Sequence, residues 1–213
     1  MKNEHNKNLT LAIETAVLGG SISLLREGSE VDFIAVEKDV SRSEDLLENI
    51  DGILKRNNAE PGEINLIAVS TGPGSYTGIR VGIATALGLK NGLGIRCVGV
   101  QLFSAMSVTM PGPAGKVICA VPIGRDEVCR QSFELGTPGP IRIDKQDTFF
   151  ERLISGENIV AILHEKLFDQ LGPDKKNDRI LNAGSRLARY IGMAADRGEG
   201  LSALEAIYIR DNT

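Results

Sequence analysis

The residues of this 213-residue sequence that could do chemistry gather in one glycine-rich stretch, Ser70-Thr-Gly-Pro-Gly-Ser-Tyr-Thr-Gly-Ile-Arg80. An apolar run of strand length ends at Ser70, and a helical pattern with Thr77 as its N-cap continues from Gly78 to Leu93. A turn of this kind aims backbone N–H groups and a helix N-terminus at one point, which is how many proteins hold phosphate. The candidate nucleotide-binding residues of the stretch are Gly72, Gly74, Ser75 and Arg80.

The spacing inside the stretch does not complete a known phosphate-binding motif. A P-loop has Lys and then Ser or Thr after its last glycine, whereas Ile79 and Arg80 follow Gly78 here. The dinucleotide pattern G-x-G-x-x-G also fails, because three residues separate Gly74 from Gly78. A tight strand-to-helix turn without a ligand is an equally good interpretation, and the sequence leaves both open.

Other groups with catalytic potential are sparse. The 2 histidines are His5, in a polar terminal segment, and His164, at a predicted strand end. A Ser-His-Asp triad would have to use His164, and Ser75 lacks the G-x-S-x-G form, so we expect His164 to be structural or solvent-facing. Glu14 follows an apolar run and could face a phosphate or a metal, although a surface position is the favoured interpretation. We expect no catalytic residue and no metal site.

The helix after the turn contains two rows of small residues. Each glycine inside a helix costs roughly 1 kcal/mol relative to alanine, so such rows indicate a neighbour that lies too close for larger side chains. The neighbour is either the protein's own sheet or a helix of another subunit, and periodicity does not distinguish them. One row consists of Gly78, Gly82 and Ala86, and the other of Ala84, Gly88 and Gly92.

Further elements are predicted on both sides of this unit. Strands are expected at Leu9–Glu14, Ser21–Arg26 and Val31–Glu37, followed by a helix from Ser41 to Asn57 that opens with the capping box Ser41-Arg-Ser-Glu44 and carries Leu47 and Ile50. The breakers Pro111-Gly-Pro113 and Gly115 predict a boundary between an N-terminal α/β domain, 1–110, and a smaller α/β domain, 111–213. The second half should contain strands Lys116–Val121, Val128–Leu135 and Asn158–Leu163, a turn at Thr137-Pro-Gly-Pro140, and helices Asp147–Ile154 and Asn182–Ala195, the last of which could pack back on the first domain.

Composition narrows the class of protein. With 42% hydrophobic and 24% charged residues, the chain is typical of a soluble globular protein. A formal net charge of −4 argues against strong autonomous binding to nucleic acid. The 3 cysteines are widely spaced and form no C-x-x-C, which favours a reducing compartment over a disulfide or zinc framework. The polar start and the lack of an apolar run of about 18 residues predict a cytoplasmic protein that does not enter a membrane.

Several of these residues together resemble a known family. The segment from Gly72 to Leu89 resembles the signature of the TsaB family, also called YeaZ. Leu11-Ala-Ile-Glu-Thr-Ala16 with Ser21-Ile-Ser-Leu24 resembles the opening strand pair of that family, and Ile207-Tyr-Ile-Arg210 resembles its Tyr-x-Arg ending. The resemblance covers almost the whole chain and is dense over the first ~100 residues.

The resemblance implies an actin-like, sugar-kinase-like (ribonuclease H-like) α/β fold with two α/β subdomains and mixed sheets. It implies a non-catalytic scaffold subunit in the synthesis of tRNA threonylcarbamoyladenosine, which dimerises with a catalytic TsaD-like subunit, helps recruit a TsaE-like ATPase and meets tRNA through the complex. No cofactor of its own is expected; ATP or ADP would bind only in the complex, and the chain alone would form a homodimer. The candidate partner-binding residues are Leu47, Ile50, Gly78, Gly82 and Ala86.

The sequence departs from the family pattern at Glu14, near Ser43 and Glu44, where relatives tend to carry His, and at Pro122. Glu14 stands where the family has Asp, and Pro122-Ile-Gly124 stands where relatives show Asp-x-Arg. The alternative function is an actin-like-fold ATPase or phosphotransferase that acts alone and uses the glycine-rich turn and Glu14 for phosphate and Mg²⁺.

Overall fold

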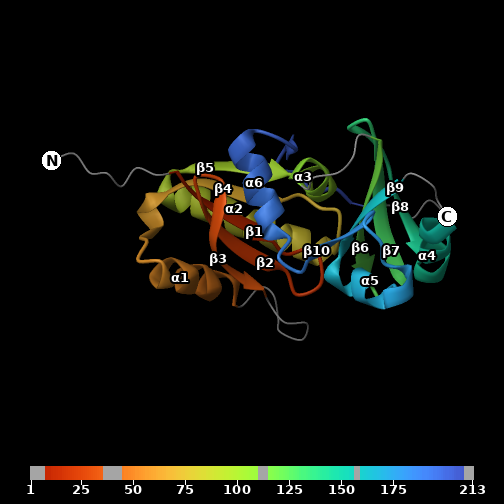
Figure 1. Ribbon diagram of the computed structural model, residues 1–213. Helices are drawn as coiled ribbons and strands as arrows, with labels where there is room; N and C mark the ends of the chain where they lie inside the picture. The colour runs from red at the N-terminus through yellow and green to blue at the C-terminus, as the bar shows by residue number, and fades with distance from the viewer. Residues whose placement is uncertain (1–7, 36–44, 110–114, 156–158, 209–213) are drawn as a thin grey trace.

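The computed structural model describes residues 8–35, 45–109, 115–155 and 159–208. Two α/β lobes follow one another along the chain (Figure 1). The first lobe contains β1 (Leu9–Glu14), β2 (Ser21–Arg26), β3 (Ser29–Ala35), α1 (Leu46–Arg56), β4 (Ile64–Ser70), α2 (Tyr76–Leu93), β5 (Arg96–Val100) and α3 (Leu102–Thr109). The second contains β6 (Lys116–Ile123), β7 (Glu127–Glu134), β8 (Thr137–Lys145), α4 (Gln146–Ser155), β9 (Ile159–His164), α5 (Glu165–Gln170), β10 (Ile180–Gly184) and α6 (Ala188–Arg197), and β11 (Leu201–Ser202) returns to the first sheet.

The two sheets share one topology. Their strand orders are β11-β5-β4-β1-β2-β3 and β10-β9-β6-β7-β8. In each lobe the first strand pairs antiparallel with the second and parallel with the fourth, as in the register Leu11↔Leu24 and Leu11↔Ile67. The same order of three strands, helix, strand, helix, strand and helix occurs twice. The expected α/β fold with two subdomains and mixed sheets is confirmed.

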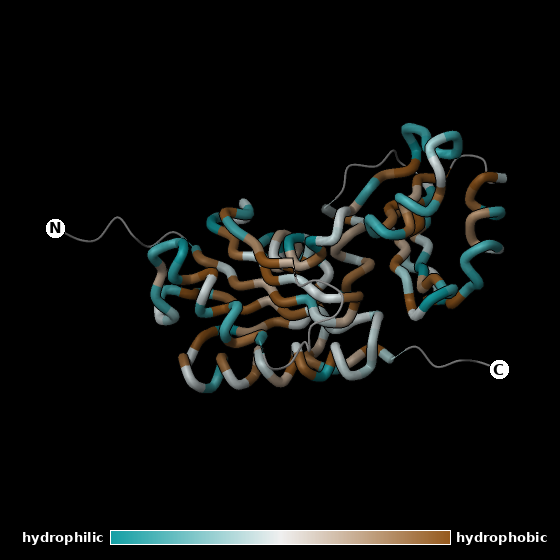
Figure 2. The backbone as a smooth tube through the Cα atoms, turned by 90° about the horizontal axis from the view of Figure 1, so that it is seen from below, coloured by the Kyte–Doolittle hydropathy of each residue, from teal (hydrophilic) through white to brown (hydrophobic). Residues whose placement is uncertain are grey.

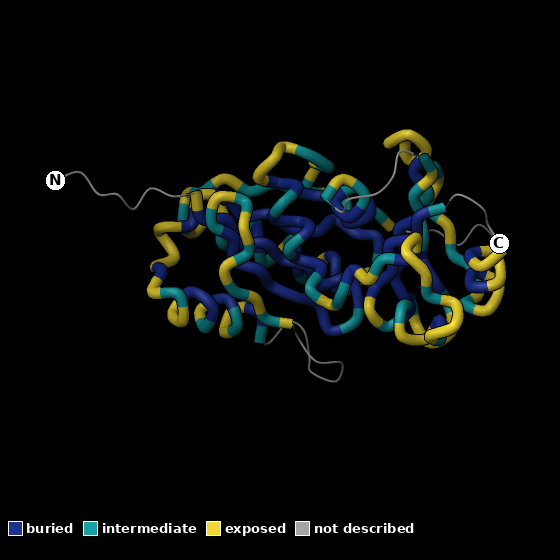
Figure 3. Tube along the Cα trace, in the orientation of Figure 1, coloured by how far each residue is buried: buried dark blue, intermediate teal, exposed yellow. Residues whose placement is uncertain are grey.

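Burial on both faces explains why the central strands are mostly apolar. All six residues of β1 are buried, because helices cover both sides of the first sheet. Figure 1 shows α6 in front of this sheet and α2 behind it. On the α1 and α2 side, Leu11 and Ile13 pack with Ile53, whereas Ala12 on the other side packs with Ile191 of α6. Hydrophobic segments follow the strands in Figure 2, and the buried chain occupies the middle of each lobe in Figure 3.

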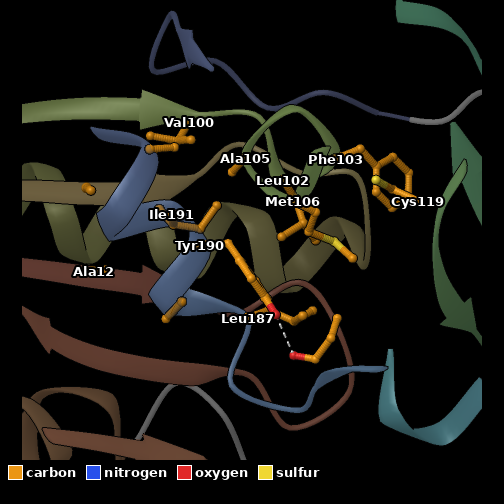
Figure 4. Close-up of a cluster of buried hydrophobic side chains, with 14 of the residues drawn as sticks. Ala12, Val100, Leu102, Phe103, Ala105, Met106, Cys119, Leu187, Tyr190 and Ile191 are labelled. Carbon is orange, nitrogen blue, oxygen red and sulfur yellow. Dashed lines mark hydrogen bonds between the residues drawn. The ribbon is translucent and has the colours of Figure 1, made fainter. Parts of the chain in front are cut away.

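One apolar cluster joins the two lobes (Figure 4). Phe103 and Met106 of α3 pack there with Cys119 of β6, so the connecting helix belongs to the core of both lobes. The last helix, α6, follows the second sheet in sequence but packs on β1 and β2 of the first. Its first residue, Ala188, donates its backbone N–H to Ser21 Oγ over 2.9 Å, and the Tyr190 hydroxyl donates to the Ala183 carbonyl over 2.9 Å.

The structure corrects three expectations. Helix α2 begins at Tyr76, and Ser75 is its N-cap in place of Thr77, because the Ser75 hydroxyl accepts the Gly78 N–H. Thr137 to Pro140 belong to strand β8, not to a turn; β8 is an edge strand, where proline is tolerated. The predicted helix from Asn182 begins only at Ala188, since residues 180–184 form β10.

Some expectations fall on residues that the structure does not describe. These are the N-terminal segment with His5, the capping box from Ser41 to Glu44, most of the boundary at Pro111 to Gly115, and Arg210. Among the described residues, no helix is both long and apolar enough to cross a membrane.

Candidate interaction site at the glycine-rich turn

The glycine-rich turn after β4 packs closely against the rest of the chain. Gly72 has φ of +102°, and a Cβ placed there would lie 2.8 Å from Ile79 Cδ1 and 3.0 Å from the Ile207 carbonyl oxygen. At Gly74, where φ is +157°, a Cβ would lie 2.6 Å from the Cβ of Ala16 in the β1–β2 connection. Both glycines are therefore needed for conformation and for close approach of two other segments.

Several backbone donors of the turn are used within the chain. The Ser75 N–H donates to the Ala16 carbonyl over 2.7 Å, and the Gly72 N–H donates to Ser70 Oγ over 3.3 Å. The Gly78 N–H donates to Ser75 Oγ over 3.3 Å. The nucleotide-binding candidates Gly72, Gly74 and Ser75 thus lie together, but these contacts make the turn part of the protein's own packing.

Glu14 is buried, which corrects the favoured expectation of a surface position. Its side chain is 1% exposed, and its Oε1 accepts the backbone N–H groups of Ala16 at 2.6 Å and Val17 at 3.1 Å. Two consecutive N–H groups that converge on one oxygen form the kind of backbone nest that binds anions. Here the anion is the chain's own carboxylate, so Glu14 closes the β1–β2 connection internally.

Arg80 forms part of an exposed cluster at the start of α2. Its guanidinium carbon lies 4.2 Å from the centroid of the Tyr76 ring, and its Nε donates to the Tyr208 hydroxyl over 3.0 Å. Tyr208 belongs to the segment that resembles the family's Tyr-x-Arg ending. The sequence singled out Arg80 and Tyr208 separately but gave no signal that they meet.

The buried row of small residues faces the protein's own sheet. A Cβ on Gly78 would lie 2.9 Å from the Thr15 carbonyl carbon, and a Cβ on Gly82 would collide with the Thr15 hydroxyl. Ala86 is 0% exposed and Ile50 is 4% exposed, both within the first lobe's core. The first lobe therefore already covers Gly78, Gly82, Ala86 and Ile50, four of the five residues that were expected to contact a partner.

The other row faces outward. Ala84, Gly88 and Gly92 are exposed, and a Cβ on Gly88 or Gly92 would meet no heavy atom within 4 Å. On α1, which lies on the same side of the sheet, Leu47 is 59% exposed. We call Leu47, Ala84, Gly88 and Gly92 the outer helix face.

His164 has a structural position in the second lobe. It is 5% exposed, and its Nδ1 accepts the Lys166 N–H over 3.1 Å at the start of α5. Ser75 lies in the first lobe, so the structure does not bring these two residues together as a triad. Within the described residues, no three His, Cys, Asp or Glu side chains are grouped to hold a metal ion.

Comparison with known proteins supports the family resemblance seen in the sequence. Residues 38–137 match the family model described as TsaD, tRNA N6-adenosine threonylcarbamoyltransferase. The tRNA threonylcarbamoyladenosine biosynthesis protein TsaB of Buchnera aphidicola subsp. Baizongia pistaciae is 32% identical over 55% of this chain, and the match spans about half, 54%, of that protein. The protein of the same name from Haemophilus influenzae is 28% identical over 86% of this chain and 75% of its own length. Together these matches support the assignment of the chain to the TsaB (YeaZ) family.

A solved structure agrees with the fold. YeaZ from Pseudomonas aeruginosa superposes with a TM-score of 0.63 at 21% identity, covering 95% of this chain and 100% of that one. The glycine-rich turn that carries the family resemblance thus contacts the β1–β2 connection, α2 and the C-terminal segment at once.

Proposed function

We propose that this chain is a non-catalytic scaffold subunit in the biosynthesis of tRNA threonylcarbamoyladenosine. It dimerises with a TsaD-like catalytic subunit and helps recruit a TsaE-like ATPase. The names of the curated TsaB relatives support the pathway, and the match of residues 38–137 to the TsaD family supports the link to that subunit.

One observation supports a non-catalytic role: backbone N–H groups at and beside the turn, which could hold a phosphate, already form hydrogen bonds within the chain. The Ser75 N–H bonds to Ala16, and the N–H groups of Ala16 and Val17 bond to Glu14. A phosphotransferase needs donors and cations preorganised around the transferring phosphoryl group. Arg80, the candidate cation near the turn, stacks on Tyr76 at the surface. These contacts favour a turn that shapes a protein surface over one that holds ATP.

The outer helix face is the docking surface in this proposal. The TsaD family match includes α1 and α2, so the catalytic relative has counterparts of the two helices. Related chains can then pair through like surfaces about an approximate two-fold axis, as identical chains do in a homodimer. Packed helices lie about 8–10 Å apart, and Gly88 and Gly92 permit the close end of that range. The same face would form the homodimer when the partner is missing.

The negative net charge of this chain indicates which subunit binds tRNA in the proposed complex. The chain has a net charge of −4, so most phosphate contacts must come from the partner. Any ATP or ADP associated with the function then binds in the assembled complex.

Reconstitution tests the proposal. The TsaD-like and TsaE-like subunits from the same genome, with their substrates and tRNA, should form modified adenosine only when this chain is added. The chain alone should turn over no ATP. Sustained ATP hydrolysis by the isolated chain that Glu14→Gln abolishes would instead favour a phosphotransferase that acts alone.

A further inference from the structure

Three exposed side chains form a preassembled surface at the N-terminal end of α2. Arg80 donates a hydrogen bond from Nε to the Tyr208 hydroxyl, and its guanidinium carbon lies 5.9 Å from the centroid of the Tyr208 ring. The Tyr76 and Tyr208 rings have centroids 4.6 Å apart and are tilted by 32°. Tyr76 is 52% exposed and Tyr208 is 42% exposed. We call Tyr76, Arg80 and Tyr208 the tyrosine–arginine cluster.

The backbone holds this cluster from two separate parts of the chain. Tyr76 is the first residue of α2. The segment that ends at Tyr208 is fixed by the bond from the Ile207 N–H to the Thr71 carbonyl, 2.8 Å, and by the pairing of β11 with β5. Preorganised side chains lose little conformational freedom when a partner binds, so such a surface can contribute affinity efficiently.

The chemistry of the cluster suits a carboxylate. A guanidinium has five N–H donors in a planar fork, and the bond to Tyr208 uses the Nε donor. Among the described residues, none of the ion pairs with Asp or Glu involves Arg80. Helix α2 carries Arg80 and Lys90 but no acidic residue, so its exposed side attracts negative charge. Arg binds carboxylates in a bidentate manner, and Tyr and Arg are enriched among the residues that dominate interface energies.

We propose that the tyrosine–arginine cluster binds an Asp or Glu side chain of the TsaD-like subunit, with an apolar neighbour of that carboxylate packed on the two rings. This inference rests on the proposed function. Ala84 and Gly88 lie four and eight residues beyond Arg80 on α2, about 6 and 12 Å along the helix axis at 1.5 Å per residue. One partner can therefore cover both the outer helix face and the cluster. A nucleic acid is the poorer occupant, because phosphate binding normally uses several cations.

Calorimetric titration of the purified TsaD-like subunit with this chain tests the assignment. Arg80→Ala should raise the dissociation constant about 30-fold, which is the size of effect expected when an interface hot spot is lost. Arg80→Lys should restore only part of the affinity, because an ammonium cannot form the planar fork. The affinity of the Arg80→Ala variant should also depend less on salt than that of the wild type.

The control is Arg125→Ala, in the exposed turn between β6 and β7, which should change neither affinity nor salt dependence. All variants should melt near the wild-type temperature, because the altered side chains are exposed. Equal affinity of wild type and Arg80→Ala would overturn this inference while the proposed function stands. No binding by the wild type would overturn both.

Two further outcomes would assign the cluster to another occupant and so overturn the proposal. In one, Arg80→Ala impairs tRNA binding by the assembled complex without changing the affinity between the subunits. In the other, Asp211→Asn reproduces the effect of Arg80→Ala, which would identify a carboxylate of this chain itself.

Discussion

The buried and exposed glycines of α2 should respond to alanine in opposite directions. At Gly78 a Cβ would collide with the Thr15 carbonyl oxygen and lie 2.9 Å from its carbon and 3.0 Å from Ala16 Cα, all backbone atoms that no side-chain rotation can move. Overpacking of this kind costs about 1–3 kcal/mol. The contact also strains the bond from the Thr15 hydroxyl to the Gly78 carbonyl, 2.7 Å long. We therefore expect Gly78→Ala to lower the free energy of unfolding by about 2 kcal/mol.

Gly88→Ala is the matched control in the same helix. No atom lies within 4 Å of its added Cβ, so alanine should only improve helix propensity, by up to about 1 kcal/mol. A change of 1 kcal/mol shifts the melting temperature by roughly 2–4 °C at this chain length. Calorimetry should then show Gly78→Ala melting about 4–8 °C below the wild type and Gly88→Ala about 2–4 °C above it. A rise in both variants would refute the packing of α2 on the β1–β2 connection.

Three further predictions follow from the same contacts. Glu14→Gln should unfold within about 1 kcal/mol of the wild type in denaturant titrations, whereas Glu14→Ala leaves two buried N–H groups without this acceptor and should cost about 2–4 kcal/mol; equal losses would contradict the role of Oε1. Cys119 and Cys129 should resist a thiol reagent at pH 8 until the chain unfolds, because burial raises both thiol pKa values, that of Cys129 to about 12; rapid labelling of the folded chain would contradict this. In filter binding, the isolated chain should hold tRNA weakly and lose it steeply with salt, and tight binding at physiological salt would contradict the partner's role.

Local patterns in the sequence were sufficient for the elements that bury continuous apolar runs. The predicted bounds of β1 and β2 are those of the structure, because each strand has a short run with apolar residues such as Leu11, Ile13, Ile22 and Leu24 that the helices bury. Strand β8 was missed, since its prolines at positions 138 and 140 are signals for a turn, and only the position of β8 at the sheet edge makes them acceptable. The repeated topology leaves no signal in the sequence, because the two lobes share an arrangement of elements and not a run of similar residues.

The site was harder to predict, because it depends on which side of α2 meets the sheet. Both small-residue rows have helical spacing, and nothing in that spacing says that Gly82 lies against Thr15 while Gly88 faces outward. The contact between Arg80 and Tyr208 joins residues 128 positions apart, so no local pattern could indicate it. Glu14 looked exposed because it ends a strand, yet the connection after β1 folds its backbone N–H groups onto the carboxylate.

The most direct test of the scaffold role is size-exclusion chromatography of this chain mixed with the TsaD-like subunit from the same genome. The wild type should co-elute with that subunit. Gly88→Arg, which places a bulky charge on the outer helix face, should abolish co-elution while the monomer still melts at or above the wild-type temperature. Gln170→Arg, which adds the same charge to an exposed position on α5 of the second lobe, should co-elute as the wild type does. A folded Gly88→Arg monomer that still co-elutes would contradict the docking face, and separate elution of the wild type would contradict the scaffold role itself.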